Sequence, residues 1–102
     1  MSGKLLLVDD EAKVLEFMEP FLRREGFEIE VAMTGREALI QAERWKPDLV
    51  VLDWMLPEGS GIEVCRKLRE KGRIGIIMVT AKNDEMDKIL GLEMGADDYL
   101  TK

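Results

Sequence analysis

The sequence predicts an α/β fold in which helices cover both faces of a doubly wound, five-stranded parallel sheet. Five short apolar runs recur along the chain, at residues 5–8, 27–32, 49–52, 74–79 and, more weakly, 96–100. Segments with helical patterns separate these runs, as expected of parallel strands joined by helical crossovers. The three middle runs are almost continuously apolar, which is typical of strands buried on both faces.

The first helical segment follows directly after the first predicted strand. We expect this helix to end near Gly26, and Pro20 costs it a hydrogen bond and favours a kink. A fourth helical pattern begins near residue 84 and stops at Gly95, because glycine readily adopts the left-handed conformation that ends many helices. The first segment has the i, i+3, i+4, i+7, i+8 spacing of an amphipathic helix, in Val14, Phe17, Met18, Phe21 and Leu22.

The second and third helices are indicated by their first turns. Thr34 with Glu37, and Ser60 with Glu63, have the spacing of a capping box. In this motif the side chains satisfy backbone N–H groups that are left free at the start of a helix. Helices are therefore predicted to begin near residues 35 and 61.

Length and charge limit the classes of function. A chain of 102 residues is expected to form one domain, spanning residues 1–102, with no room for a separate output domain. Hydrophobic residues at 46% and charged residues at 35% favour a folded, soluble protein over a disordered segment. The net charge of -6 repels a phosphate backbone, so we do not expect this chain to bind nucleic acid by itself.

Two residue types constrain the chemistry and the compartment. The chain has no histidine, which removes the commonest general base, the commonest zinc ligand and any phosphohistidine carrier. Cys65 is the single cysteine, so it has no intramolecular disulfide partner and fits a reducing compartment. The apolar run near the N-terminus is too short for a signal sequence or a membrane span. We therefore expect a cytoplasmic protein that does not engage a membrane.

Polar side chains follow four of the predicted strands. Asp9 and Asp10 follow the first strand, Asp53 closes the third, Thr80 closes the fourth and Lys102 follows the fifth. In the flavodoxin-like strand order 2-1-3-4-5, the first and third strands are neighbours at the point where the sheet reverses direction. Ligands bind beyond the carboxyl ends of the strands at such a point. This order brings the three aspartates into one cleft.

Three carboxylates in one cleft repel one another unless a positive charge compensates them. Mg²⁺ is the expected cofactor, because it prefers a few carboxylate oxygens, retained waters and a substrate phosphate. Asp53 follows a buried apolar run and is the best-placed nucleophile for forming an acyl phosphate.

Each of these residues also has a structural interpretation. A pair of acids after a strand is most often a solvated turn, and Asp53 alone is compatible with a helix cap. Thr80 fits ordinary strand propensity, and Lys102 fits an ordinary surface position. Their shared location at the strand ends favours the functional interpretation.

Four segments resemble the signature segments of bacterial two-component response-regulator receiver domains. The segments are LLLVDDE, VVLDWMLPEGSG, IIMVTAK and GLEMGADDYLTK, and the resemblance runs from Lys4 to the last residue. It implies a signalling domain that takes a phosphoryl group from a sensor histidine kinase and switches conformation to control an output. Such a domain catalyses only its own phosphorylation and dephosphorylation and is not an enzyme in the usual sense.

The resemblance also implies a role for each matching residue at the acidic cleft. Asp53 is implied to be the phosphoacceptor and a ligand of Mg²⁺, with Asp10 as a direct ligand and Asp9 as a ligand through water. Met55 is implied to bind the ion through its backbone carbonyl.

Three further matching residues are implied to report on the phosphoryl group. Thr80 is implied to hydrogen-bond it, and Lys102 to pair with one of its oxygens. Tyr99 is implied to be the aromatic residue whose rotamer follows the phosphorylated state, although it is also compatible with a partly buried aromatic.

The residues around Asp53 and the GADDYLTK segment resemble those of the OmpR/PhoB-type subclass, whose receiver precedes a winged-helix DNA-binding domain. The parent protein would then regulate transcription as a phosphorylation-promoted homodimer. Receivers of this type continue past the lysine into a fifth helix, whereas this chain stops at Lys102. We expect the missing final helix to leave apolar side chains of the fourth and fifth strands exposed.

Two other functions remain open at this stage. A small phosphohydrolase of the haloacid-dehalogenase type also uses an aspartyl phosphate, but it carries a second aspartate two residues on, where this chain has Met55. A pseudo-receiver would keep the fold as a binding module without phosphorylation. Asp53→Asn should abolish phosphodonor labelling in a working receiver while leaving the fold and any phosphorylation-independent binding intact.

Overall fold

The structure, a computed structural model, describes residues 3–53, 56, 61–72, 74–80 and 98–101, and for residues 80 and 98–101 it describes the backbone alone. Strands and helices alternate along most of this length, as the apolar runs predict. The elements in chain order are β1 (Lys4–Val8), α1 (Ala12–Arg24), β2 (Glu28–Ala32), α2 (Gly35–Trp45), β3 (Leu49–Asp53), α3 (Gly61–Glu70), β4 (Gly75–Thr80) and β5 (Asp98–Thr101).

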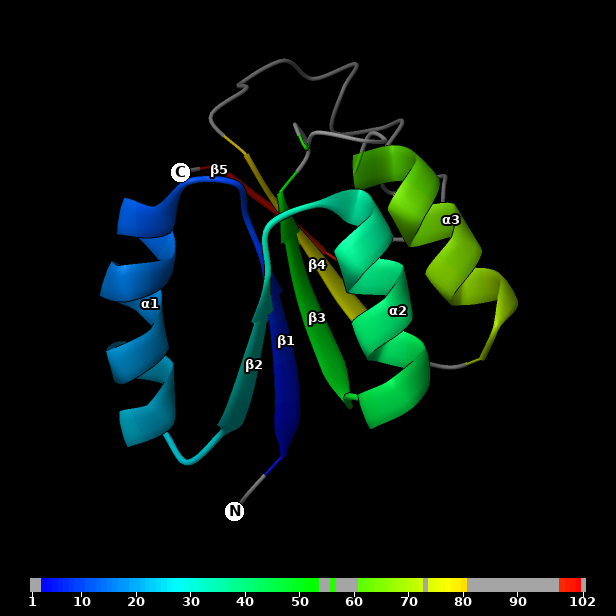
Figure 1. Cartoon of the computed structure of the whole chain (residues 1–102). Helices are drawn as coiled ribbons and strands as arrows, with labels where there is room; N and C mark the ends of the chain where they lie inside the picture. Colours follow the sequence, from blue (N-terminus) through cyan, green and yellow to red (C-terminus); the bar gives the residue numbers. More distant parts are fainter. Residues whose placement is uncertain (1–2, 54–55, 57–60, 73, 81–97, 102) are drawn as a thin grey trace.

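The strands form one parallel sheet in the order β2-β1-β3-β4-β5. Helix α1 covers one face of the sheet, and α2 and α3 lie side by side over the other (Figure 1). The predicted doubly wound α/β fold is confirmed, including the neighbouring positions of β1 and β3. The helix predicted to begin near residue 84 and to stop at Gly95 lies outside the described residues.

Alternate residues of β1 supply the two halves of the core. Leu5 and Leu7 point toward α1, whereas Leu6 and Val8 join the cluster beneath α2 and α3. All four side chains are at most 1% exposed. Because each such side chain contributes roughly 1.5–3 kcal/mol when it leaves water, the central strand is anchored from both faces.

Helix α1 ends where the sequence predicts. The N–H of Gly26, which has a φ of 100°, donates to the carbonyl of Arg23 at 3.0 Å, and the N–H of Phe27 donates to that of Leu22 at 3.3 Å. These two bonds form a Schellman motif, which satisfies carbonyls left free at the helix end. Pro20 lies inside the helix, which extends on both sides of it.

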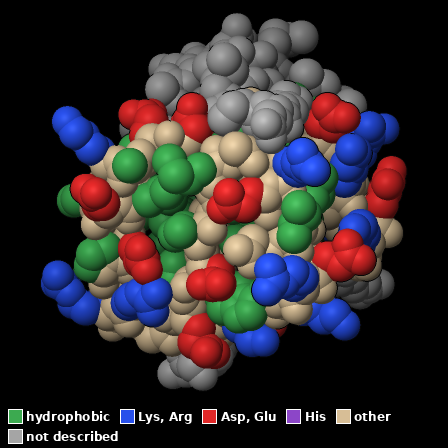
Figure 2. All heavy atoms as spheres, viewed as in Figure 1, with side chains coloured by type: hydrophobic (Ala, Val, Ile, Leu, Met, Phe, Trp, Pro, Cys, Tyr) green, Lys and Arg blue, Asp and Glu red, His purple; other side chains and the backbone are tan. Residues whose placement is uncertain are grey.

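The apolar stripe of α1 is only partly buried. Leu15 is 7% exposed, and Met18 packs against the core cluster on the α1 face. Phe17 and Phe21 share the stripe's spacing but are 79% and 57% exposed. A helix lying on a sheet buries only the part of its circumference that touches the strands, so periodicity alone overestimates this face. Figure 2 shows hydrophobic side chains gathered over α1 among the charged ones.

The two faces of β4 are covered unequally. Ile76 and Met78 are fully buried beneath α2 and α3. Val79 points to the α1 face and is only half-buried there. Ile77 and Val79 are thus partly covered, and the side chains of β5, for which exposure was also expected, lie outside the described residues.

The Thr34 half of the predicted capping box is seen at the start of α2. The Oγ1 atom of Thr34 accepts a hydrogen bond from the N–H of Glu37 at 3.0 Å. Helix α3 begins at Gly61, as expected, while Ser60 lies outside the described residues. Within the described ranges, no helix is long and apolar enough to cross a membrane.

Truncating the two kinds of α1 side chain should have opposite consequences. Leu15→Ala should lower the free energy of unfolding by about 2–4 kcal/mol, because it opens a cavity beside the sheet. Phe17→Ala should change it by less than about 0.5 kcal/mol, since the ring is mostly in water. Urea denaturation followed by circular dichroism measures both. A loss of similar size in Phe17→Ala would contradict the exposure of this ring.

Candidate functional site

The parallel register of β1 and β3 assembles an acidic cluster at the carboxyl ends of these strands. Val8, the last residue of β1, pairs with Leu52 of β3. The next residues in each chain segment are Asp9 and Asp53, so the two aspartates leave the sheet side by side. Asp10 follows directly. The sequence predicted this meeting, and the register confirms it.

The carboxylates are close enough to share a ligand. Asp9, Asp10 and Asp53 each offer one oxygen, and these three oxygens lie within 4.8 Å of one another. Asp9 is 3% exposed and Asp53 is 5% exposed, whereas Asp10 is open to solvent. The cluster therefore has two buried carboxylates and one at its mouth.

The loop between β1 and α1 holds Asp9 in place. Its backbone N–H donates to the carbonyl of Ala32 at the end of β2, at 3.1 Å. Its Oδ1 atom accepts a hydrogen bond from the N–H of Glu11 at 2.9 Å. This second bond is an Asx turn, in which an aspartate side chain bonds the backbone two residues on. The sequence analysis missed it, although an aspartate at the end of a strand is a recognised signal for such a turn.

The chemistry of the cluster fits a hard divalent cation. All three groups are carboxylates, and burying two of them is costly unless positive charge or hydrogen bonds compensate. Opposite oxygens around Mg²⁺ are separated by about 4.2 Å, twice its usual ligand distance. The observed spread is slightly larger, and rotation of the exposed Asp10 side chain or a bridging water would close the difference. The acidic triad is thus typical of a Mg²⁺ site.

The remaining predicted residues are described in part or not at all. Val79 of β4 pairs with Asp53, so Thr80 follows at the same edge of the sheet. Tyr99 lies in β5, where it pairs with Met78. Of Thr80 and Tyr99 only the backbone is described. Met55 and Lys102 lie outside the described residues.

Comparison with known families gives one match over almost the whole chain. The model of the family described as "Response regulator receiver domain" matches residues 5–102. Among curated proteins, the alkaline phosphatase synthesis transcriptional regulatory protein PhoP of Bacillus subtilis is 52% identical over 103 residues. The match covers 100% of this chain and 43% of PhoP, so the chain spans less than half the length of this relative.

Solved structures agree in fold. The BeF3-activated N-terminal receiver domain of Klebsiella pneumoniae RstA superposes with a TM-score of 0.95 at 37% identity, covering 98% of this chain and 86% of that one. A response regulator from Chloroflexus aurantiacus superposes with a TM-score of 0.91 at 38% identity, covering 100% of this chain and 86% of that one.

Removing one charge from the cluster should stabilise the protein in metal-free buffer. Asp10→Asn keeps the shape of the side chain and removes one of three mutually repelling carboxylates. We expect the free energy of unfolding to rise by about 0.2–1 kcal/mol at low ionic strength, and by less as salt screens the repulsion. Urea denaturation in the presence of a chelator measures the change.

Glu16→Gln is the matched control, because it neutralises an exposed carboxylate of α1 that is not a member of the cluster. It should change the stability less than Asp10→Asn does. A destabilised Asp10→Asn variant would show that Asp10 is engaged in a favourable contact instead.

Proposed function

Because the chain belongs to the response regulator receiver domain family, we propose that it takes a phosphoryl group onto Asp53 from the phosphohistidine of a sensor histidine kinase. A receiver domain is a signalling phosphoacceptor and not an enzyme that turns over an external substrate. The observation that supports the proposal is the position of Asp53, which is 5% exposed at the end of β3 and shares a cluster with Asp9 and Asp10.

The transfer requires one bond to form and one to break. An oxygen of the Asp53 carboxylate forms a bond to phosphorus while the bond from phosphorus to the histidine nitrogen of the kinase breaks. The histidine leaves as neutral imidazole after taking up a proton, and Asp53 becomes an acyl phosphate. Attack of water on phosphorus later returns the carboxylate and releases inorganic phosphate. Burial of Asp53 limits the access of water to this bond.

Asp10 would bind Mg²⁺ directly and Asp9 through water, together with Asp53 and the backbone carbonyl of Met55. When bound, the ion supplies positive charge that offsets the carboxylates and polarises the incoming phosphoryl group. The Glu11 N–H donates to one Asp9 oxygen at 2.9 Å and so restricts rotation of this carboxylate. The exposed Asp10 side chain is free to rotate toward the ion.

Thr80, Lys102 and Tyr99 would couple the phosphoryl group to a change in conformation. Thr80 would hydrogen-bond a phosphoryl oxygen, which is supported by its place beside Asp53 at the end of β4. Lys102 would pair with another oxygen, and the rotamer of Tyr99 would follow the state of Thr80. Phosphorylation adds charge and acceptor oxygens, which favour one of two existing arrangements.

Residues 1–102 would act as the receiver of a longer cytoplasmic protein. The relative PhoP is named as a transcriptional regulatory protein and is more than twice the length matched by this chain. By that similarity, the parent protein would control transcription through a DNA-binding output domain. Phosphorylation would promote its homodimerisation, and this chain by itself would bind neither nucleic acid nor membrane.

Incubation with Mg²⁺ and acetyl phosphate should add one phosphoryl group to the purified chain, as read by intact mass. Asp53→Asn should abolish the labelling, because an amide oxygen is a poor nucleophile and cannot form the acyl phosphate. Asp48→Asn is the matched control, since Asp48 precedes the opposite end of the same strand. It should label as the unaltered chain does.

A chelator should also prevent labelling of the unaltered chain. Circular dichroism of every sample establishes that the variants are folded. If Asp53→Asn accepted the phosphoryl group while folded, the phosphoacceptor would be another residue. Absence of labelling in the folded unaltered chain would favour a pseudo-receiver.

A further inference from the structure

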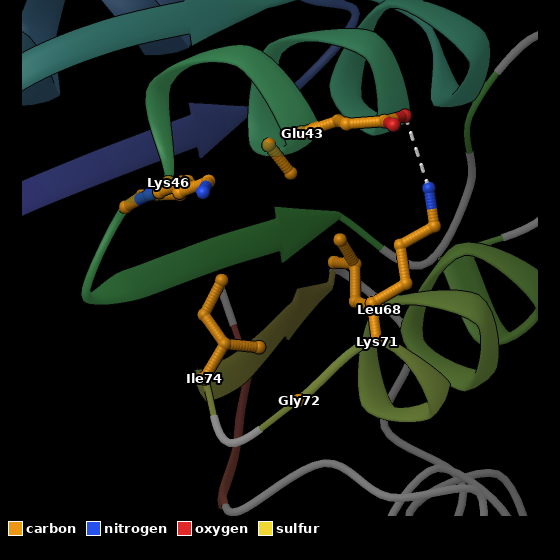
Figure 3. A pocket seen from close by; sticks show the side chains of 8 residues that line it. Glu43, Lys46, Leu68, Lys71, Gly72 and Ile74 are labelled. Carbon is orange, nitrogen blue, oxygen red and sulfur yellow. Dashed lines mark hydrogen bonds and ion pairs between the residues drawn. The ribbon is translucent and has the colours of Figure 1, made fainter.

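A concave site lies at the opposite end of the sheet from the acidic cluster. The last turns of α2 and α3 and the segments leading into β3 and β4 surround a hollow of about 410 Å³ (Figure 3). Strand β3 runs from this end to Asp53, a distance of about 13 Å for a strand of this length. The hollow therefore shares no residue with the phosphoryl-transfer site.

The floor of the hollow is apolar. Leu68 of α3 is 3% exposed, and Pro47, between α2 and β3, is buried. Ala42 and Ile74 are half-buried and line the walls. At the rim, a Cβ atom added to Gly72 would meet nothing within 4 Å, so the mouth is open on this side. A ligand with a hydrophobic body would remove these walls from water.

Charged side chains surround the hollow, and one of them, that of Lys46, has no oppositely charged partner among the described residues. Lys71, which directly follows α3, places its Nζ 3.2 Å from Glu43 Oε2 of α2, so the two charges of this pair offset each other. Figure 3 shows the pair on one side of the hollow and Lys46 on the other. Within the described residues, no carboxylate or carbonyl meets the ammonium group of Lys46. Among the described residues that line the hollow, Lys46 is thus the one uncompensated positive charge, on a chain with a net charge of -6.

The backbone holds Lys46 at this place. It is the C-cap of α2 and has a φ of 53°, the left-handed conformation that ends a helix. The buried Pro47 follows it and restricts the chain further. The helix end therefore fixes the point at which the Lys46 side chain leaves the backbone, next to the buried Pro47.

We propose that this hollow binds a small apolar anion, with its hydrophobic body on Leu68 and Ile74 and its anionic group paired with Lys46. The volume lies within the range of about 300–1,000 Å³ that is typical of small-molecule sites, which combine apolar walls with a few polar groups. A neutral ligand would leave Lys46 unpaired. A cationic ligand would face repulsion from it, because Glu43 is already engaged by Lys71.

Two dyes of similar shape test the proposal. Anilinonaphthalene sulfonate is an apolar anion, and phenyl-naphthylamine is its uncharged counterpart. In titrations followed by amide chemical shifts, both should perturb Ala42, Gly72 and Ile74. The anion should bind about 3- to 10-fold more tightly, the range expected for one charge-assisted contact at a partly exposed site.

Variants of the chain distinguish the effect of the Lys46 charge on dye binding from the effect of the shape of the hollow. Lys46→Asn should abolish the preference for the anion while keeping the backbone, because asparagine tolerates the left-handed conformation. Arg24→Gln removes one positive charge from the end of α1 and should leave the preference unchanged. Ala42→Leu fills the hollow and should weaken the binding of both dyes.

Equal affinity for the two dyes, or an anion preference that survives Lys46→Asn, would overturn the proposal. So would shifts confined to the exposed apolar surface around Phe17 and Phe21. Labelling of Asp53 by acetyl phosphate should proceed in Lys46→Asn, so a failure of this site is distinguishable from a failure of the phosphoacceptor site.

Discussion

Parallel pairing of β1 with β3 is the constraint on which the site depends. The pair aligns Val8 with Leu52, and so Asp9 and Asp53 leave the sheet at the same edge. Burial of β1 and β3 on both faces favours this register, because a slip of one residue would exchange the side chains that face α1 with those that face α2 and α3. Leu6 and Leu7 face opposite sides of the sheet, and each is at most 1% exposed. Such a slip would therefore disrupt the packing on both faces at once. The same apolar contacts that stabilise the sheet thus align the carboxylates.

The site concentrates charge where burial makes charge costly. Asp9 and Asp53 are nearly inaccessible to solvent, while most other charged side chains of the described residues remain at the surface. Buried carboxylates of this kind are typical of functional sites, because they lower the stability of the fold but are needed for the reaction. In a receiver domain, the same negative site attracts a divalent cation and presents a nucleophile. The same three carboxylates therefore repel one another in the metal-free state and provide the site for phosphoryl transfer.

Much of the fold and of the acidic site was predictable from local patterns. The strand at residues 49–52 was found within one residue of β3, and Thr34 caps α2 as its spacing with Glu37 indicated. Caps and apolar runs depend on contacts a few residues apart, which a sequence displays directly. The Asx turn of Asp9 and the hollow beside Lys46 were not anticipated. The hollow arises between two helices and two loops, and no sequence pattern spans that arrangement.

The sequence by itself determined the strands and helices of the described residues, to within a few residues, and the aspartates at the strand ends, because periodicity and residue type act locally. Only the tertiary structure decided that Asp9 is buried and Asp10 exposed, although the two are adjacent and chemically identical. It also decided that Leu15 enters the core while Phe17 stays in water. The physical reason is that burial depends on which surfaces meet in space. A helix or a loop offers several faces, and only the packing of the other elements selects one.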